Sequence, residues 1–285
     1  MPERSRALLT DRGVIRVTGE DARNFLQGLV SNDVRRVAPD RAIYAALLTP
    51  QGKYLFDFFI AEADGALLID CERARLPDLV KRLTIYKLRA KAALEDVSDA
   101  FKVVAVWGDG GTGETGSAEP IAGGVGFTDP RLAEAGRRLI LPADAPLPDS
   151  TEAAPEAYDA YRLALGLPDG SRDMVLEKAI LLESGFDELN GVDWKKGCYM
   201  GQELTARTKY RGLVKKRLVP VGVDGPLPEP GTPVMAGEKE VGELRSGQGA
   251  RALALIRLEV LEDAATELRA GDARVHPEKP AWASF

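Results

Sequence analysis

One short stretch of this sequence carries more chemical information than any other: Lys196-Gly197-Cys198-Tyr199-Met200-Gly201-Gln202-Glu203. Two glycines flank the triplet that begins with Cys198, and glycine permits backbone turns and close ligand approach that other residues resist. Residues 202–210 are compatible with a short helix, so Cys198 is expected just ahead of a helix N-terminus. This position, beside Lys195 and Lys196, favours the thiolate form of the cysteine.

The residue types leave two interpretations of Cys198 open. A thiolate in this setting is a candidate nucleophile, redox group or transient metal ligand. Most free cysteines are instead small buried hydrophobic residues, and that interpretation is favoured for Cys71, which ends an apolar strand without a basic cluster around it. The two cysteines and the single histidine, His276, are too few for a four-ligand zinc site of those residue types, and we predict no metal site.

The segment from Lys195 to Arg217 is strongly cationic. It contains eight basic residues and a single acid, Glu203, so its charge is +7 in a chain whose total is −6. Such a run is commonly a solvated surface face. Here Trp194 and two tyrosines are interleaved with the charges, and this mixture also suits a flat heterocycle with carboxylates or a nucleic-acid strand.

The bulk composition restricts the class of protein. The chain has 285 residues, of which 45% are apolar and 29% are charged, and this is typical of a globular protein with two or three domains. No apolar run is long enough to span a bilayer, and the first ten residues lack the apolar region of a secretory signal. Because the two cysteines also fit a reducing compartment, we expect a soluble cytoplasmic protein with no membrane partner.

The pattern of apolar residues predicts an α+β chain in three parts. Residues 1–145 form an N-terminal α+β region with two possible interleaved subdomains, 146–215 hold a linker, a helix and the motif segment, and 216–285 form an antiparallel β-barrel. Apolar runs predict strands over residues 14–18, 43–49, 54–61, 67–70, 91–97, 101–107, 218–223, 232–235, 241–245 and 251–257. Helical spacing is found near residues 21–29, 76–83 and 158–165, and the Gly-rich residues 108–126 are expected to be a surface loop.

Several segments together resemble a known family. The motif at residues 196–203 is similar to the K-G-C-Y-x-G-Q-E signature of the YgfZ-type folate-binding proteins, which are relatives of the glycine-cleavage T-protein (GcvT, an aminomethyltransferase). Three further segments agree with this family, and they are Phe25-Leu26-Gln27-Gly28 with Ser31-Asn32-Asp33, the hairpin at residues 48–53, and the barrel segment 231–256. The resemblance implies a GcvT-like three-domain ring around a central channel for tetrahydrofolate, with a C-terminal antiparallel β-barrel.

The resemblance also implies a function. The family is implicated in the assembly or repair of iron–sulfur enzymes, especially radical enzymes that modify tRNA, and Cys198 matches its functional cysteine. The expected partners are therefore a reduced folate and iron–sulfur client or assembly proteins, with a possible weak contact to tRNA.

The candidate site combines one thiol with charged, aromatic and amide side chains, and its members are Cys198, Asp57, Trp194, Lys195, Lys196, Tyr199, Gln202, Glu203, Arg207 and Arg211. The thiol is the reactive group. The four cations offer charge to the folate carboxylates or to the thiolate, and the two aromatic residues are placed to pack on the pterin or its benzoyl ring. Trp194 is equally consistent with core packing. The carboxylate of Asp57 is assigned to the pterin's amino group and ring N–H.

Two alternative functions stay open. A folate-dependent aminomethyl or other one-carbon transferase would follow the T-protein more closely. The T-protein, however, carries an acidic pair after its hairpin strand, and the matching pair here is Phe56-Asp57, so one acid–base group is missing. A non-enzymatic tRNA-binding protein would use the +7 segment, and its binding would weaken steeply with salt.

Overall fold

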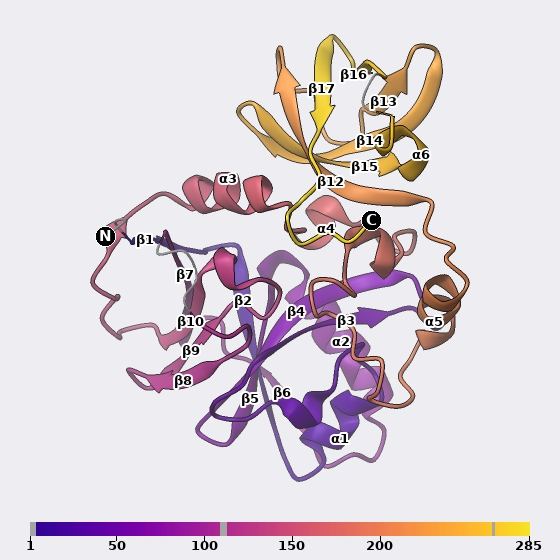
Figure 1. Ribbon diagram of the computed structural model, residues 1–285. Coiled ribbons are helices and arrows are strands. Elements are labelled where there is room, and N and C mark those ends of the chain that lie inside the picture. Colours follow the sequence, from indigo (N-terminus) through magenta and orange to yellow (C-terminus); the bar gives the residue numbers. More distant parts are fainter. Residues whose placement is uncertain (1–3, 109–112, 264–265) are drawn as a thin grey trace. The chain divides into compact units, whose positions relative to one another are not determined.

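The computed structural model describes residues 4–108, 113–263 and 266–285 (Figure 1). The chain forms two compact units. The first, called the sheet unit, comprises Met1–Pro50, Leu55–Tyr158 and Leu189–Gln202, and the second, called the barrel unit, comprises Gln51–Tyr54, Asp159–Glu188 and Glu203–Phe285. The α+β class is confirmed, and the three-part division at residues 145 and 215 stays a prediction.

The first sheet of the sheet unit has five strands in the order β3-β4-β5-β2-β6. Its strands are β2 (Arg12–Thr18), β3 (Ile43–Leu48), β4 (Tyr54–Ala63), β5 (Ala66–Glu72) and β6 (Ala93–Asp96). All six residues of the edge strand β3 and the first eight of β4 are buried, so both faces of these two strands are covered. A strand covered on both faces is continuously apolar rather than alternating, as these two runs are.

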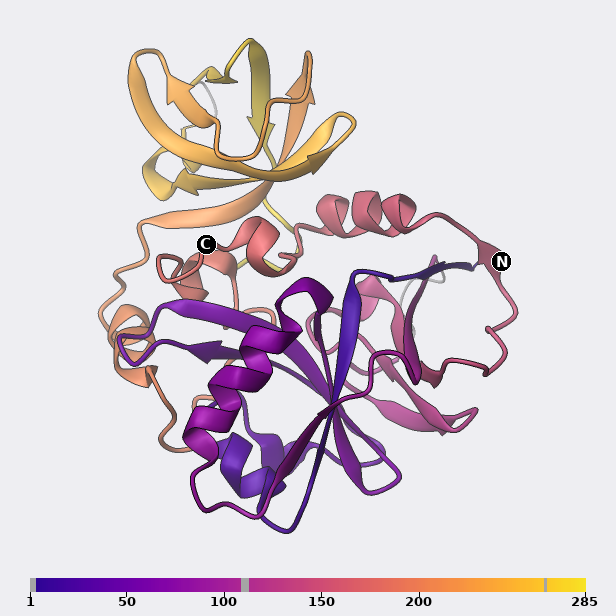
Figure 2. The ribbon, with the colours of Figure 1, turned by 180° about the vertical axis from the view of Figure 1, so that it is seen from behind.

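Two helices cover one face of this sheet (Figure 2). They are α1 (Ala22–Gln27) and α2 (Leu76–Lys87), and short 3₁₀ turns, η1 (Val34–Arg36) and η2 (Arg73–Arg75), stand beside them. The helical spacing predicted for α2 is confirmed, since Leu79 and Leu83 are fully buried against strand residues such as Ile60 and Ile69. This apolar layer fixes the position of α1 and of the segment that follows it.

The second sheet has six strands in the order β11-β1-β7-β10-β9-β8. Its strands are β1 (Ser5–Leu8), β7 (Phe101–Trp107), β8 (Ala118–Ile121), β9 (Gly124–Thr128), β10 (Arg137–Pro142) and β11 (Thr151–Glu152), with η3 (Ala133–Ala135) between β9 and β10. The prediction of a surface loop over residues 108–126 is therefore wrong for the β8–β9 hairpin, and residues 109–112 lie outside the described residues. Gly124 is a packing residue, because a Cβ there would lie 2.0 Å from the carbonyl oxygen of Ile140.

A buried ion network joins the two sheets. The carboxylate of Asp70 on β5 is fully buried and accepts hydrogen bonds from Arg12 Nε at 2.7 Å and from Arg138 on β10 at 2.9 Å. A buried carboxylate needs such partners, because burying an unpaired charge is strongly unfavourable. The guanidinium of Arg138 also lies 4.3 Å from the centre of the Phe59 ring, so charged and aromatic groups share this layer.

The barrel unit contains a closed six-stranded barrel in the order β12-β15-β14-β13-β16-β17, as expected. Its strands are β12 (Lys216–Asp224), β13 (Pro233–Ala236), β14 (Lys239–Gln248), β15 (Arg251–Arg257), β16 (Leu268–Ala270) and β17 (Ala273–Pro277). The remaining helices of the described chain are α3 (Pro155–Leu165), α4 (Gly170–Asp173), η4 (Leu181–Ser184), α5 (Gln202–Tyr210) and α6 (Leu258–Leu261). The helix predicted over residues 202–210 thus has the expected bounds.

Candidate functional site

The motif segment, residues 190–202, lies against the chain that follows α1. The amide of Met200 donates to the carbonyl of Gly28 at 3.1 Å, and the amide of Asp193 donates to the carbonyl of Ser31 at 3.1 Å. The hydroxyl of Ser31 donates to the carbonyl of Gly191 at 2.6 Å. Two sequence motifs about 165 residues apart, separated by most of both sheets, therefore form one local structure.

Lys196 provides the centre of this local structure. Its ammonium donates to the carbonyl oxygens of Gln27 at 2.8 Å and Asn32 at 2.9 Å, and also to that of Val30. The side chain is only 5% exposed, and Nζ lies 5.2 Å from the centre of the Tyr199 ring. Burial lowers the pKa of Lys196 to about 8, although Asp33 and Asp193 oppose the shift. The ammonium thus satisfies carbonyl groups left open beyond the C-terminal end of α1.

Cys198 is an exposed free thiol only two residues away. Gly197 before it has a φ of +91°, a conformation that L side chains rarely adopt, and this turn carries the chain out of the buried position of Lys196. After the cysteine, the Tyr199 amide donates to Gln202 Oε1 at 3.2 Å, which closes the turn before α5. Cys71 differs, because burial raises the pKa of that thiol to about 12. Of the two interpretations of Cys198, the small buried residue is therefore excluded.

Asp57 and Phe56 occupy opposite faces of β4. Phe56 belongs to the core beneath the helices, where the Arg75 guanidinium lies 4.1 Å from the centre of its ring. Asp57 is 7% exposed and accepts a hydrogen bond from the Tyr44 hydroxyl at 2.8 Å. Burial and the Asp57 carboxylate both raise the pKa of Tyr44 well above its usual value, so Tyr44 is a constant donor. Only the second residue of the predicted pair therefore lies on the polar side of the sheet.

Asn32 connects the surroundings of Asp57 to the motif segment. Its amide nitrogen donates to the carbonyl of Tyr44 at 2.7 Å and to the carbonyl of Asn190 at 2.7 Å. Because the carbonyl of Asn32 also accepts from Lys196, one asparagine touches both halves of the candidate site. The side-chain amide of Asn190 in turn donates to the carbonyl of Pro130 at 3.1 Å.

Arg131 is a buried cation of this region that the sequence analysis missed. It donates to Asp129 through Nε at 3.0 Å and through a terminal nitrogen at 2.8 Å. Burial lowers its pKa, but the Asp129 carboxylate outweighs this and raises the pKa well above the usual value. The guanidinium lies 4.9 Å from the Phe59 ring centre and 5.3 Å from that of Tyr44. An Asp-Pro-Arg sequence directly after a buried strand was the available signal.

The remaining predicted residues are mostly exposed. Lys195 lies exposed beside the motif turn, and Trp194 is half-buried. Glu203, Arg207 and Arg211 are exposed on or just after α5, which belongs almost entirely to the barrel unit. The structure therefore places Lys196 and Tyr199 around the backbone of Cys198 and links Asp57 to Lys196 through Tyr44 and Asn32. The charges of α5 lie in the other unit.

The +7 segment is partly neutralised by contacts within the barrel unit. Arg217 is buried and donates to Glu188 at 2.8 Å and to the carbonyl of Leu182 at 2.8 Å. Lys209 forms an ion pair with Asp187 at 2.8 Å. Within this segment, the exposed cations without an ion pair to the described residues are Lys195, Arg207, Arg211 and Lys215.

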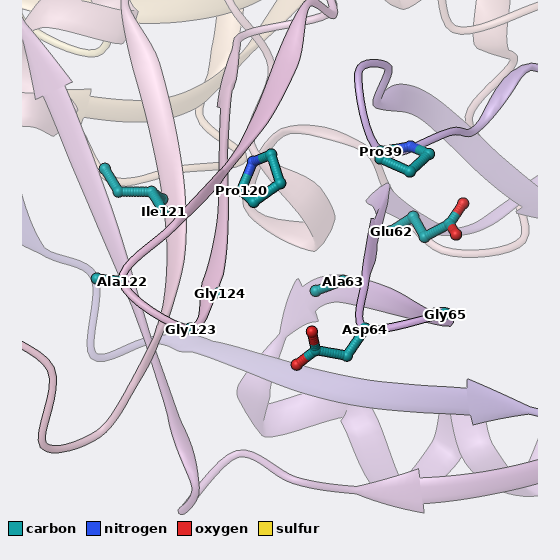
Figure 3. A pocket seen from close by; sticks show the side chains of 10 residues that line it. All are labelled: Pro39, Glu62, Ala63, Asp64, Gly65, Pro120, Ile121, Ala122, Gly123 and Gly124. Atoms are coloured by element: carbon teal, nitrogen blue, oxygen red, sulfur yellow. The ribbon is translucent and has the colours of Figure 1, made fainter.

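A pocket of about 230 Å³ lies at the far end of β4 (Figure 3). Its walls are the β4–β5 turn, the β8–β9 turn and Pro39, and the charged groups among its lining residues are the carboxylates of Glu62 and Asp64. Glu62 is paired with Arg23. The pocket contains none of the predicted folate residues, and its acidic lining does not suit the carboxylates of folate. Among the described residues, no group of three or more His, Cys, Asp or Glu is arranged to hold a metal ion.

Comparisons with family models place two known domains on this chain. Residues 9–110 match the GCVT N-terminal domain, and residues 215–285 match the CAF17 C-terminal beta-barrel domain. Among solved structures, the glycine cleavage system aminomethyltransferase T from Bartonella henselae has the same fold. Its TM-score is 0.79 with 15% identity, over 99% of this chain and 87% of that protein. The GcvT-like fold is thus confirmed.

Several curated relatives are iron–sulfur cluster assembly factors with the same name. The mitochondrial iron–sulfur cluster assembly factor IBA57 of Mus musculus is 35% identical over 278 residues, which cover 89% of this chain and 78% of the relative. The human protein of the same name is 34% identical, over 87% of this chain and 76% of the relative. The homologue from Mycosarcoma maydis is 38% identical, over 75% of this chain and 56% of the relative.

These relatives correct two expectations. They are IBA57 proteins rather than YgfZ-type proteins specifically, although both resemble the T-protein. They are also named as mitochondrial proteins, which overturns the prediction of a cytoplasmic protein. In the described residues, no helix has the length and apolar character needed to cross a membrane.

Proposed function

Because this chain belongs to the IBA57 family of iron–sulfur cluster assembly factors, we propose that it acts in the assembly or repair of iron–sulfur proteins, with Cys198 as its reactive thiol and a reduced folate bound near Asp57. The clients we infer are iron–sulfur enzymes, among them radical enzymes that modify tRNA. The single observation that carries the proposal is the exposed sulfur of Cys198 on a segment whose neighbouring residues are buried and tied down.

The placement of Cys198 supports a role as a reactive group. Lys196 and Tyr199 on either side are buried, so the turn is held in one conformation while the sulfur faces solvent. A pre-organised and accessible thiol is suited to contact a partner, because little conformational entropy is lost when the contact forms.

The chemistry around Asp57 supports a folate. The pterin of a reduced folate presents an amino group and a ring N–H side by side, and a carboxylate accepts from both at once. The Tyr44 hydroxyl, which donates to Asp57 Oδ2 at 2.8 Å, holds this carboxylate in place. An ionised carboxylate is thus the type of acceptor that matches the two donors of the pterin. A bound tetrahydrofolate would supply ring nitrogens that carry one-carbon units, while Asp57 and Tyr44 orient its pterin.

The environment of Phe56 argues against the aminomethyltransferase alternative. Its side chain lies in the apolar core with Arg75 above its ring, away from Asp57. A second carboxylate beside the folate is therefore missing at this position, and no acid–base partner is supplied there. A folate that is bound without this second carboxylate would serve a binding or sensing role rather than group transfer.

Two measurements test the proposal. A strain that depends on this chain should lose iron–sulfur enzyme activity when it carries Cys198→Ser, and it should keep that activity with Cys71→Ser at matched protein levels. Calorimetric titration with tetrahydrofolate should give saturable binding to the wild-type chain and weaker binding to Asp57→Asn. Full activity of the Cys198→Ser strain would refute the thiol role, and absence of binding heat at saturating folate would refute the folate assignment.

A further inference from the structure

The C-terminal end of α2 contains a residue that is unfavourable in two ways. Leu88 follows the last helical residue with a φ of 46° and a ψ of −111°. A leucine rarely takes a positive φ, because its side chain crowds the backbone. Its side chain is also 87% exposed. Strain of this kind persists where the surrounding structure or a function requires it.

The local turn explains the backbone but not the choice of leucine. The amide of Ala90 donates to the carbonyl of Lys87 at 2.8 Å, which closes a four-residue turn. The dihedral angles of Leu88 are those of the first central position of a type II′ turn, where glycine is the favoured residue. Since so little of the leucine side chain is buried, packing within the described fold does not account for its presence.

The neighbours of Leu88 give this end of the helix a distinct chemistry. Ile85, one turn earlier, is 58% exposed. Lys81, Arg82 and Arg89 make no hydrogen bond or ion pair within the described chain. We call the set of Lys81, Arg82, Ile85, Leu88 and Arg89 the α2 tip. Other lysines close by are engaged, because Lys87 donates to the carbonyl of Ala92 and Lys91 pairs with Glu20.

We propose that the α2 tip is a docking surface for an acidic protein partner, with the Leu88 side chain entering a small apolar pocket rimmed by carboxylates. Three unpaired cations around two exposed apolar side chains are complementary to such a surface. The expectation that this partner acts in iron–sulfur assembly rests on the proposed function. The acidic character of the partner follows from the α2 tip alone.

Other occupants fit the tip less well. A bilayer surface is bound through a long apolar helix face, and two apolar side chains are a small area for that purpose. Single-stranded nucleic acid is held by stacking on aromatic rings, and the tip has an isoleucine and a leucine in their place. A symmetric second copy would bring Lys81, Arg82 and Arg89 against themselves.

The first experiment places a photoreactive p-benzoylphenylalanine at the exposed Thr84, beside the tip, and irradiates living cells. One adduct is expected, and the partner that mass spectrometry identifies should be an iron–sulfur assembly or client protein with an acidic face. The adduct should be lost with Leu88→Gly and with Arg89→Glu. It should persist with Leu176→Gly, a matched change of a surface leucine that is 39% exposed in the other unit.

The second experiment titrates the identified partner with the purified full chain. Leu88→Gly and Arg89→Glu should each weaken binding at least tenfold, and added salt should weaken wild-type binding. Leu88→Gly should keep or raise the melting temperature, because glycine relieves the backbone strain. Equal affinity of Leu88→Gly and wild type would overturn the proposal. Leu88-dependent pelleting with equimolar phosphatidylglycerol and phosphatidylcholine vesicles, or a Leu88-dependent dimer in sedimentation equilibrium, would overturn it as well.

The Cys198→Ser variant separates this proposal from the proposed function. If the adduct persists while iron–sulfur enzyme activity is lost, both proposals are supported. If Cys198→Ser loses activity but the wild-type chain forms no adduct that depends on the α2 tip, the docking surface is refuted and the thiol role is supported. If the adduct forms but Cys198→Ser is fully active, the thiol role falls and the docking surface stands.

Discussion

Lys196 and Arg207 come from the same cationic segment, yet they lie in contrasting environments. Lys196 belongs to the sheet unit, is 5% exposed and donates to three backbone carbonyls. Arg207 belongs to the barrel unit, lies exposed on α5 and has no ion pair in the described chain. The sequence assigned the same role to both, namely charge for a folate or a thiolate. In the structure, the first cation organises the backbone around Cys198 and the second is available to an anion.

The difference shows that a charge count does not distinguish a structural cation from a binding cation. What separates the two is the supply of unsatisfied carbonyl groups nearby. The chain after α1 leaves such groups open, and a buried ammonium with three donors meets them. On α5, the Arg207 carbonyl already accepts from the Arg211 amide at 3.1 Å, and the Arg207 side chain is exposed.

The largest effect is expected at Cys198, beside the structural cation. Cys198→Ala should reduce cellular iron–sulfur enzyme activity to the level of a strain without this chain, because we propose that the exposed sulfur is the reactive group. Its melting temperature should stay within a few degrees of wild type, since an exposed side chain contributes little to stability. Activity assays and thermal unfolding on the same preparations check both statements, and retained activity would contradict the first.

Removing the structural cation should destabilise the fold. Lys196→Met leaves three carbonyls without their donor, and this loss is partly offset because an ammonium is no longer buried. We expect a net loss of about 1–3 kcal/mol in the free energy of unfolding. Lys195→Met, the exposed neighbour, is the matched control and should change it by less than about 0.5 kcal/mol. Equal effects in urea unfolding would remove the distinction between the two cations.

The Asp57 carboxylate should dominate folate affinity. Asp57→Asn keeps the size of the side chain but exchanges an ionised acceptor for a neutral amide. We expect tetrahydrofolate to bind about tenfold more weakly, which corresponds to about 1.4 kcal/mol. Calorimetry provides the measurement, and Glu62→Gln in the distant pocket is the control. Unchanged affinity of the Asp57 variant would move the folate site elsewhere.

The buried ammonium should also give stability a characteristic pH dependence. The folded chain releases the Lys196 proton near pH 8, whereas the unfolded chain holds it to about its ordinary pKa of 10.5. Between these values the unfolded state binds more protons, so the contribution of this group to stability rises with pH, by at most about 1.4 kcal/mol per unit. The difference in unfolding free energy between wild type and Lys196→Met, measured from pH 7.5 to 9.5, should rise accordingly; a flat difference would contradict the shifted pKa.

The smallest effect on stability is expected on α5. Arg207→Ala should change the free energy of unfolding by less than about 0.5 kcal/mol, because the side chain is exposed and forms no ion pair with the described residues. If Arg207 contacts an anionic ligand, the same variant should weaken tetrahydrofolate binding, and this effect should shrink at high salt. A large loss of stability would place Arg207 with Lys196 among the structural cations.

Helices and strands were predicted well from the sequence where a buried face gave the apolar residues a strong periodicity. The spacing of Leu76, Leu79 and Leu83 predicted α2, and continuous apolar runs predicted the buried strands β3 and β4. The β8–β9 hairpin was missed because its glycines resemble a loop, whereas Gly124 is required by the close approach of Ile140. Strand β16 is only three residues long and depends on barrel partners rather than on a pattern of its own.

The candidate site was predicted in part for a similar reason. Cys198 and Asp57 lie in local motifs, and a local motif is visible in one sequence. Tyr44 and Arg131 enter the site through contacts between elements, and the only local signal was the Asp-Pro-Arg sequence that ends at Arg131, which does not reveal its contact with Tyr44. The role of Lys196 depended on three carbonyl groups whose positions no residue pattern specifies.

The alternation along β4 has a consequence for mutations that change chain length. Phe56 faces the helix-covered core and Asp57 faces the polar side, because successive residues of a strand point to opposite faces. Deleting one residue between Gly52 and Phe56 would exchange the two faces for the rest of the strand. It would press a carboxylate into the core and turn a phenyl ring toward Tyr44. Single-residue deletions here should therefore be far less tolerated than any substitution.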